Sequence, residues 1–404
     1  MVFILPTQMV QKMDVTINKP NLLRITTVPI SLDKLLCHQM KFMKSNGFEV
    51  TMMSADGPEI SKIVEREECE HIIIPLTRQI TPFKDLVALY VLTKHLIRIK
   101  PNIVHTHTPK AGLIGMMAAW LCRVPIRIHT VAGLPLQTSV GAKRELLIGI
   151  EKLTYYFANH IWPNSRSLYN FIKTHKLTNL SKLHIIGCGS SNGIDIDEYD
   201  PNSIKQDILN NIKSQMGYDK NFRYLLFVGR VVKDKGIEEL IEVFNKIQLI
   251  HKDLKLILVG PFEQELDPIP DNIIHEIRTN KNIISIGYSN HVKYYMAMSN
   301  LFVFPSHREG FPNVLLQAGL MGLPIICSDI DGNIDIVDNN LTGVLFPVKN
   351  VNLFEDALNK AMNNEEMMIK YAQNLKTIVL NNYDRRIIHK NIFARYKFML
   401  ANVK

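Results

Sequence analysis

The chain has few cysteines and no long apolar run. Its five cysteines are scattered over 404 residues without a CxxC pair, which argues against a secreted disulfide framework and against a structural zinc site. The longest apolar run extends only from Ala111 to Cys122 and is too short to span a bilayer. These absences favour a cytoplasmic protein with reduced thiols.

Several familiar motifs are also missing. Neither half carries GxGxxG after its first predicted strand, and GxxxxGK[ST] does not occur, which disfavours nicotinamide-dependent oxidation and P-loop hydrolysis. The N-terminus has a short apolar stretch without a preceding basic region, so it does not resemble a secretory signal. We expect residues 1–21 to form an extension outside the folded part.

Length and charge indicate two domains with different partners. A chain of this length is long for one domain, and 46% hydrophobic with 21% charged residues is the mix of a folded protein. The net charge is +9, of which residues 1–190 carry +11 and the remainder −2. The basic first half indicates an anionic partner, which would be nucleic acid, an anionic membrane face or a phosphorylated substrate.

Apolar segments rich in Ile and Val alternate with amphipathic segments through both halves. This alternation predicts an α/β protein with parallel sheets in two Rossmann-like domains. The last strand expected in the first half is Leu183–Ile186, and the second half restarts at Arg223. Residues 191–202, rich in Asn and Asp, form the predicted linker between domains at 22–190 and 203–384.

The segment PSHREGFPNVLLQA, at Pro305–Ala318, has the strongest signal for a ligand site. A buried strand ends at Phe304, a polar loop with Glu309 follows, and a helix begins near Asn313. The free N–H groups and positive dipole end of that helix suit a phosphate. A carboxylate repels phosphate, so we expect Glu309 to accept hydrogen bonds from hydroxyls. An ordinary loop with a solvated Glu is an equally good interpretation.

A second loop, FVGRVVKDKG at Phe227–Gly236, repeats this arrangement with basic residues. Arg230 and Lys235 follow a buried strand and would project from the same edge of the sheet. A bidentate guanidinium and a point-charge ammonium suit a diphosphate. The alternative is that Arg230 and Lys235 are ordinary solvated charges on a loop. Two such loops on one sheet make this alternative less satisfactory.

Three further patterns invite a metal interpretation. His105 and His107 are two residues apart, so on a strand they face the same side, but no third ligand follows at short range. We expect a packed His105 and an active-site His107 at the strand end. Asp195–Asp197 and Asp329–Asp331 are DxD pairs of the kind that can hold Mg²⁺ or Mn²⁺, although solvated loop carboxylates are the favoured interpretation of both.

Together these motifs resemble the retaining, nucleotide-sugar-dependent glycosyltransferases of family 4, which have the GT-B fold. The match spans about residues 22–400, and its anchors are VHTHTPKAGLIGMMAAWLCRVPIRIHTVAGLP, GSSNGID, FVGRVVKDKG and FPSHREGFPNVLLQAGLMGLPIICSDIDGN. Within the family the chain is similar to bacterial capsule and O-antigen sugar transferases. The resemblance implies two domains facing a central cleft, with a C-terminal helix at about 385–401 that packs back on the first domain.

The resemblance also assigns roles to residues. It implies that Arg230 and Lys235 hold the donor diphosphate and that Glu309 contacts the hydroxyls of the donor sugar. His107 would lie near the reacting sugar carbon. The backbone amides of the next segment would contact sugar and phosphate; its residues are Gly310, Phe311, Pro312 and Asn313.

Two departures from the family pattern concern the ribose and the acceptor. Position 317 is where a second Glu would contact the nucleotide ribose, and here it is Gln317, whose amide oxygen still accepts a hydroxyl bond without charge. The loop after the first strand reads TTVPISLDK and lacks the glycine-rich turn of many relatives. The position of the acceptor is therefore open.

The resemblance implies a reaction and its partners. The donor would be a nucleoside diphosphate sugar, with UDP expected, and the acceptor a lipid-diphosphate-linked saccharide, with retention of anomeric configuration. Basic residues and helix amides would stabilise the leaving diphosphate, so neither a metal nor another cofactor is expected. Such an enzyme would be peripheral at the inner face of the cytoplasmic membrane. The amphipathic segment Lys84–Lys100 could lie on anionic lipid, although packing on the sheet is the simpler alternative.

Three other functions compete with this one. A nucleotide-sugar epimerase or phosphorylase would use the same two-domain scaffold without a lipid acceptor. A nucleic-acid-binding protein would use the basic first half, but basic patches interleaved with aromatics and known binding motifs do not occur in the sequence, so no nucleic-acid partner is expected. A scaffold that has lost activity is suggested only weakly, by Gln317.

Overall fold

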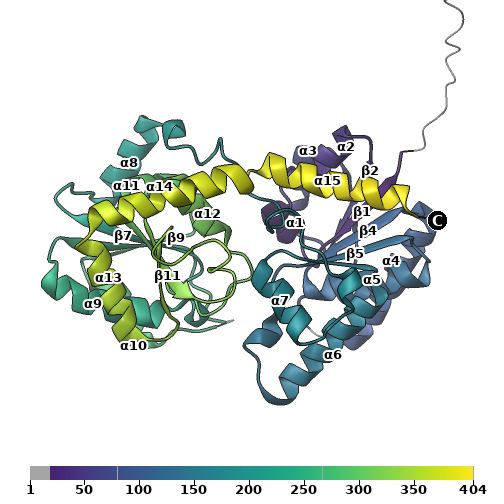
Figure 1. Cartoon of the computed structure of the whole chain (residues 1–404), viewed down its shortest axis with the longest axis horizontal. Helices are drawn as coiled ribbons and strands as arrows, with labels where there is room; N and C mark the ends of the chain where they lie inside the picture. Colours follow the sequence, from purple (N-terminus) through teal and green to yellow (C-terminus); the bar gives the residue numbers. More distant parts are fainter. Residues whose placement is uncertain (1–18, 80, 266, 404) are drawn as a thin grey trace, which may run out of the picture.

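The computed structural model describes residues 19–79, 81–265 and 267–403, so most of the expected N-terminal extension lies outside the described residues. The chain forms two α/β domains side by side, and a pair of C-terminal helices runs along both of them (Figure 1). Each domain has one parallel sheet. The fold class predicted from the alternation of strands and helices is confirmed.

The N-terminal domain has a six-stranded sheet in the order β3-β2-β1-β4-β5-β6. Its strands are β1 (Asn21–Ile25), β2 (Glu49–Ser54), β3 (Glu70–Ile73), β4 (Ile103–His107), β5 (Ile126–Val131) and β6 (His160–Pro163). The central strands β1, β4 and β5 are almost fully buried, because helices cover both faces of a parallel sheet. The segment expected as a seventh strand makes only one bridge, between Leu183 and Ile161.

Two layers of helices enclose this sheet. One layer covers one face and consists of α4 (Pro82–Ile99), α5 (Pro109–Leu121), α6 (Gly141–Phe157) and α7 (Arg166–Thr174). The opposite face is covered by α1 (Pro29–Leu35), α2 (Gln39–Ser45), α3 (Ile60–Glu67) and the C-terminal α15 (Arg385–Ala401). Within the described ranges, no helix has both the length and the apolar character needed to cross a membrane.

The C-terminal domain repeats the design with the strand order β12-β11-β10-β7-β8-β9. Its strands are β7 (Arg223–Val228), β8 (Leu254–Val259), β9 (Ile283–Gly287), β10 (Leu301–Phe304), β11 (Ile325–Asp329) and β12 (Val344–Pro347). Its helices are α8 (Gln206–Met216), α9 (Ile237–Ile250), α10 (Asp271–Thr279), α11 (Val292–Met298), α12 (Asn313–Leu320), α13 (Val351–Met362) and α14 (Glu365–Asn382). In both sheets the strand order reverses beside the first strand, at β1/β4 and β7/β10, and ligands bind at such switch points.

The chain passes between the domains twice, and the two passages pair with each other. The N–H of Ile194 donates to the carbonyl of Tyr383, and the N–H of Arg385 donates to the carbonyl of Ile194, both at 2.8 Å. Beyond this point α15 lies on the N-terminal domain, where the hydroxyl of Tyr396 contacts the buried Arg24 of β1. The last helix therefore ties the end of the chain to its first strand.

Candidate active site between the two domains

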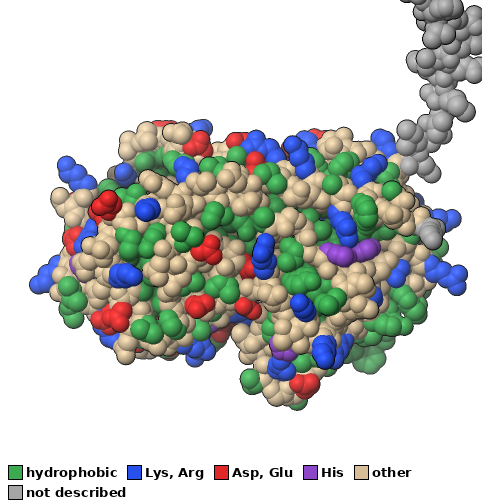
Figure 2. All heavy atoms as spheres, in the orientation of Figure 1, with side chains coloured by type: hydrophobic (Ala, Val, Ile, Leu, Met, Phe, Trp, Pro, Cys, Tyr) green, Lys and Arg blue, Asp and Glu red, His purple; other side chains and the backbone are tan. Residues whose placement is uncertain are grey.

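A cavity of about 320 Å³ lies between the domains, at the C-terminal ends of strands from both sheets. Figure 2 shows the surface hollowed between the two halves. The N-terminal domain lines the cavity with the starts of α5 and of the loop after β5, and the C-terminal domain with the loops after β7 and β10. The loops singled out in the sequence of the C-terminal domain therefore meet at its switch point.

Close backbone packing brings the two loops of the C-terminal domain together. The loop after β7 ends in a short turn, η4 (Lys233–Lys235), followed by Gly236 with φ +69°. A Cβ at Gly236 would lie 2.1 Å from the carbonyl oxygen of Pro305, which no side chain tolerates. This glycine lets Lys235 reach the loop that follows β10.

Each cation that lines the cavity is paired with a carboxylate. Lys235 forms an ion pair with Glu309, and Ser306 Oγ donates to the same carboxylate at 2.8 Å. Two more pairs complete the set, Arg230–Glu263 at 2.8 Å and Arg308–Asp234 at 3.1 Å. The cavity therefore presents three basic groups, Arg230, Lys235 and Arg308. An anion that carries more charge than one carboxylate can displace their carboxylate partners and bind them.

Most of the remaining predicted donor residues lie beyond the cavity lining. Of the segment 310–313, only Gly310 lines the cavity. Phe311 packs against Tyr383 with ring centroids 5.6 Å apart, and Pro312 precedes the first turn of α12, whose N–H groups have no side-chain cap. Asn313 starts α12, and the half-buried Gln317 lies one turn further along it.

The two domains touch beside the cavity. A Cβ at Gly310 would lie 1.8 Å from the carbonyl oxygen of Ala132, in the loop after β5. Gln137 donates to Asp331 at 2.6 Å, and the carboxylate of Asp335 accepts bonds from two backbone N–H groups at the start of α7, at 2.8 and 3.1 Å. Residues of both domains are therefore held at the same cavity.

The structure places His107 in a different cavity from Arg230, Lys235 and Glu309. It lines a space of about 20 Å³ beside Trp162 and the start of the linker, and its ring stacks on His105 at 4.3 Å. Burial and the nearby Arg24 lower the pKa of His107 well below its usual value. The two histidines do share one side of β4, as the strand period requires.

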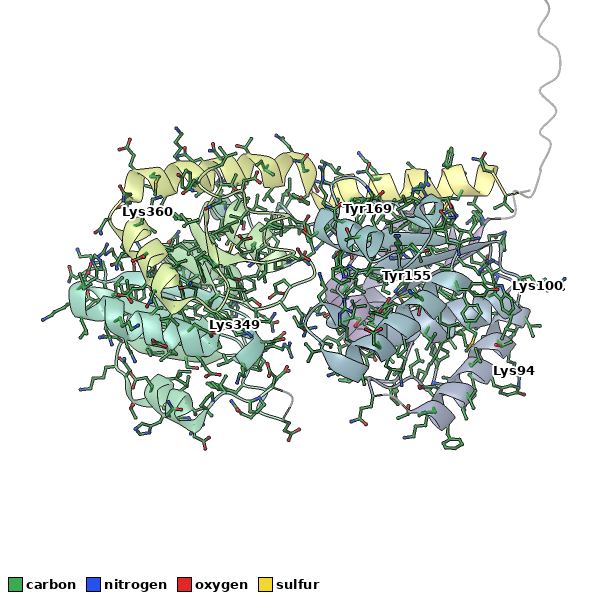
Figure 3. All side chains as sticks on the ribbon, turned by 60° about the horizontal axis from the view of Figure 1, so that its bottom comes forward. Lys94, Lys100, Tyr155, Tyr169, Lys349 and Lys360 are labelled. Carbon is green, nitrogen blue, oxygen red and sulfur yellow. The ribbon has the colours of Figure 1, made fainter. Side chains whose placement is uncertain are left out.

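His129 and Glu151 line the main cavity although the sequence patterns assigned them no role. His129, on β5, forms a hydrogen bond with Thr106 at 2.9 Å, and burial lowers its pKa to about 4. Glu151, on α6, is buried, and burial raises its pKa to about 7. Tyr155, one turn further along α6, lies inside the N-terminal domain (Figure 3). The sequence offers one signal for each residue, because His129 follows the Ile-rich segment IRI and Glu151 follows the apolar run LLIGI.

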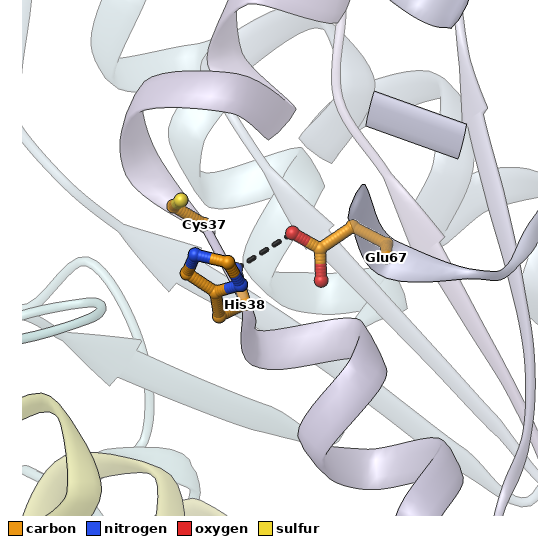
Figure 4. A group of neighbouring side chains, drawn as sticks. All are labelled: Cys37, His38 and Glu67. Carbon is orange, nitrogen blue, oxygen red and sulfur yellow. Dashed lines mark hydrogen bonds between the residues drawn. The ribbon is translucent and has the colours of Figure 1, made fainter. Parts of the chain in front are cut away.

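Metal-ligand geometry occurs once in the described part of the chain, away from the cavity. Cys37, His38 and Glu67 have ligand atoms within 4.8 Å of one another (Figure 4). The carboxylate of Glu67 already accepts bonds from two backbone N–H groups at the start of α2, at 2.6 and 3.1 Å, and from Arg66 at 2.8 Å. It therefore caps the helix.

The DxD pairs also have protein partners. Asp195 accepts from two backbone N–H groups of its own loop at 3.1 Å and pairs with Arg385 at 3.0 Å. Asp331 accepts from Gln137 across the domain interface, and burial raises its pKa. Both pairs hold loops and domains in place.

Comparison with known proteins identifies the family. Two family models match, Glycosyl transferase 4-like over residues 31–165 and Glycosyl transferases group 1 over residues 210–377. The capsular polysaccharide biosynthesis glycosyltransferase CapM of Staphylococcus aureus is 34% identical over 370 residues, which cover 91% of this chain and 94% of CapM. The chain belongs to the family 4 glycosyltransferases. The resemblance drawn from the motifs is confirmed, and the protein is a transferase.

Two further comparisons extend the assignment. UDP-Gal:alpha-D-GlcNAc-diphosphoundecaprenol alpha-1,3-galactosyltransferase of Escherichia coli is 25% identical to this glycosyltransferase over 378 residues, 91% of this chain and 94% of the relative. The crystal structure of Anabaena HepE in complex with UDP and glucose matches with a TM-score of 0.76 at 16% identity, covering 94% of this chain and 99% of HepE. This likeness shows the GT-B fold.

Proposed function

We propose that this glycosyltransferase moves a sugar from a nucleoside diphosphate sugar, with UDP as the nucleotide, to a lipid-diphosphate-linked saccharide. The product would belong to a bacterial capsule or O-antigen polysaccharide. The observation that carries the donor is the convergence of Arg230, Lys235 and Arg308 with Glu309 on one cavity. Two of the similar proteins support these proposed substrates. The Escherichia coli relative is a transferase that combines UDP-Gal with a diphosphoundecaprenol-linked sugar, and HepE binds UDP.

The ion pairs of the cavity suggest how the donor is received. A diphosphate carries more charge than one carboxylate and would compete for Arg230 and Lys235. Once Lys235 turns to the phosphate, Glu309 loses its ion-pair partner and can accept hydrogen bonds from sugar hydroxyls. Donor binding would thus replace the ion pair of Lys235 by one with the diphosphate, while Ser306 and the sugar hydroxyls would donate hydrogen bonds to the carboxylate of Glu309.

The chemistry follows from the same charges. Cleavage of the bond between sugar and phosphate leaves negative charge on the diphosphate, which Arg230, Lys235 and the start of α12 would stabilise. A phosphate oxygen of the leaving group would take the proton of the acceptor hydroxyl on the face where that hydroxyl attacks. This course retains the anomeric configuration and requires neither metal nor cofactor.

The acceptor would approach from the N-terminal domain at the inner face of the cytoplasmic membrane. Support comes from the charge of residues 1–190, which is +11 and attracts anionic lipid. Within the cavity, His129 and Glu151 are the ionisable groups that this domain contributes. They would face the acceptor side of the reacting sugar.

A thermal-shift screen tests the donor site. UDP, GDP, ADP and their sugar conjugates are compared with and without Mg²⁺. We expect one diphosphate to raise Tm equally in both conditions, because ligand binding to the folded state stabilises it by mass action. Arg230→Ala should abolish the shift, and Arg278→Ala, which removes an exposed arginine outside the cavity, should preserve it. No response to any diphosphate would count against the proposal.

Product analysis tests the reaction. With a short lipid-diphosphate-linked saccharide as acceptor, we expect the new glycosidic bond to have the donor's anomeric configuration by NMR. An inverted product would overturn the proposed course. Conversion of the sugar nucleotide without any acceptor would instead favour an epimerase or phosphorylase.

A further inference from the structure

The loop after β11, residues 330–338, packs against the loop that carries Glu309. Gly332 of this β11 loop has φ +88°, and a Cβ there would lie 2.9 Å from the carbonyl oxygen of Gly310 and 3.0 Å from that of Glu309. A side chain at this position would be strained by the backbone and crowded by both oxygens. The two loops are therefore in backbone contact, and a displacement of one would displace the other.

A buried asparagine fixes the β11 loop to the ends of the strands. Asn333 is fully buried, and its Nδ2 donates to the carbonyl and to the hydroxyl of Ser328 at 2.9 and 3.2 Å. The hydroxyl of Ser328 in turn donates to the carbonyl of Ser306, which follows β10. The β11 loop thus has little freedom to move separately from the loop that carries Glu309.

The β11 loop also carries an aspartate that reaches the other domain. The carboxylate of Asp335 accepts hydrogen bonds from the backbone N–H of Arg166, at 2.8 Å, and from that of Ser167, at 3.1 and 3.3 Å. Both N–H groups belong to the first turn of α7, which lies beside the C-terminal domain (Figure 1). Asp335 itself lies outside the lining of the cavity.

This aspartate completes the N-terminal cap of α7. The first N–H groups of a helix have no partner within the helix. The hydroxyl of Ser165 accepts from the N–H of Leu168 at 3.2 Å, but the first turn of α7 contains no acidic residue of its own. The positive end of the helix dipole favours a carboxylate at this place. Separation of the domains would leave Asp335 and two N–H groups without each other, so the cap favours domains that stay in contact.

Two further contacts involve the β11 loop. Gln137 of the N-terminal domain donates to Asp331 at 2.6 Å. The hydroxyl of Tyr383, beside the crossing of the two interdomain passages, lies 3.4 Å from the carbonyl oxygen of Asp335. The β11 loop is therefore joined to the N-terminal domain, to the interdomain crossing and to the loop that carries Glu309.

We infer that Asp335 is a positioning residue for sugar transfer, because its cap on α7 holds the loop with Glu309 and Gly310 against the N-terminal half of the cavity. The proposed reaction needs groups of both domains at one place, and an error of about 1 Å in their separation can cost two orders of magnitude in rate. The inference goes beyond the proposed function and rests on that function for its kinetic test.

Hydrogen exchange of the full chain tests the contact without donor or acceptor. We expect the amides of Arg166 and Ser167 to exchange slowly in the wild type, because N–H groups at a helix start are protected only where a partner accepts them. Asp335→Ala should accelerate this exchange at least tenfold, and Asp335→Asn, which keeps one acceptor oxygen, should accelerate it less. The matched control Asp338→Ala removes an exposed carboxylate of the same loop and should leave the exchange unchanged. Equally fast exchange in the wild type and in Asp335→Ala would show that the contact does not form in solution.

Steady-state kinetics test the positioning role. In Asp335→Ala we expect kcat to fall at least tenfold while the Kd of the diphosphate changes less than threefold, because Arg230 and Lys235 both belong to the C-terminal domain. A purely structural role would lower Tm without separating kcat from Kd in this way, and Tm verifies that each variant is folded at the assay temperature. Equal kcat values of Asp335→Ala and Asp338→Ala would contradict the role.

A substitution on α7 tests the same contact from the other side. Arg166→Pro removes one of the two N–H donors, and proline is well tolerated at the first position of a helix. The preceding Ser165 is extended, with φ −151° and ψ 160°, as a residue before proline should be. We expect Arg166→Pro to lower kcat and Arg166→Ala, which keeps the N–H, to match the wild type. The double variant Asp335→Ala/Arg166→Pro should be no slower than Asp335→Ala, and additive losses would argue against a shared contact.

Small-angle scattering separates failure of this inference from failure of the proposed function. The measurement needs no substrate, and the radius of gyration should be larger in Asp335→Ala than in the wild type or in Asp338→Ala. An unchanged radius of gyration in Asp335→Ala would overturn the inference. Absence of transfer by the wild type with every acceptor would instead refute the proposed function, while scattering and hydrogen exchange would still decide whether Asp335 holds the domains together.

Discussion

At the scale of single residues, the cavity is organised by groups whose charge state depends on their neighbours. Lys235 and Glu309 are both largely buried and hold each other, so neither is free until a ligand replaces the other. On the opposite side, burial keeps His129 neutral by lowering its pKa to about 4. One nitrogen of this neutral imidazole is hydrogen-bonded to Thr106, and the other can donate or accept one hydrogen bond at the cavity.

Replacement of the two histidines distinguishes their roles. His129→Asn should lower kcat by about 100-fold, within the range for loss of a positioned polar group at a reacting centre. His107→Asn should lower Tm but leave kcat within a factor of about three, because His107 lies in the separate cavity beside Trp162. Steady-state kinetics and thermal unfolding of both variants are the measurements. The reverse order of effects on kcat would restore His107 to the role that the resemblance implies.

At the scale of elements, the decisive contact joins two loops. The loop between β10 and α12 meets the loop after β5 at Gly310 and Ala132. Both loops follow strands that end at the cavity, so in the proposed function their backbone separation would set the distance between donor and acceptor. A shift of about 1 Å can change a rate by two orders of magnitude when reacting groups must align.

A methyl group at position 310 should separate these loops. In Gly310→Ala the added Cβ would lie 1.8 Å from a backbone carbonyl oxygen, which cannot rotate away as a flexible side chain would. We expect kcat/KM to fall at least tenfold, with a smaller effect on diphosphate affinity. Gly149→Ala on α6, where a Cβ meets nothing within 4 Å, is the control. Equal activity of the two variants would contradict this role for Gly310.

At the scale of the whole molecule, the sides of the protein differ in charge and in buried titratable groups. The first half carries the positive charge. His105, His107, His129 and His389 are buried on the N-terminal side of the molecule. Burial lowers the pKa of His129 to about 4 and that of His389 to about 3, and it places the pKa of His105 and His107 well below the usual value.

Stability should therefore fall on acidification. Below about pH 6.5 these histidines bind protons in the unfolded chain but stay neutral in the folded chain. The free energy of unfolding therefore decreases as the pH decreases. Glu151 acts in the opposite sense between about pH 7 and 4.5, because burial raises its pKa to about 7 and the folded state then binds the extra proton. Four histidines outweigh one carboxyl. We expect a net loss of about 2–4 kcal/mol in unfolding free energy between pH 6.5 and 5.5.

Urea unfolding at a series of pH values measures this loss. Glu151→Gln should steepen the decrease between pH 7 and 5, because it removes the opposing group. The same variant should be more stable than the wild type at pH 8, where the buried carboxylate is charged. A midpoint that does not change with pH would show that the histidines are accessible to protons in the folded state.

The sequence by itself determined the fold class and half of the site. Strand and helix periods are local, so alternating segments specify parallel sheets wherever they occur. Arg230, Lys235 and Glu309 lie two, seven and five residues after a strand end, and such residues gather at one edge of a parallel sheet. Their convergence could therefore be predicted from spacing alone.

Only the tertiary structure decided the other half of the site and the packing of the last helix, because these features join residues that are far apart in the chain. It placed His129 and Glu151 in the cavity and His107 outside it, since neighbouring strands determine which strand ends face the cleft. It joined Tyr396 to Arg24 across 372 positions. It also left one face of α4 uncovered, and a sequence period reveals the sides of a helix but not which of them a neighbour will cover.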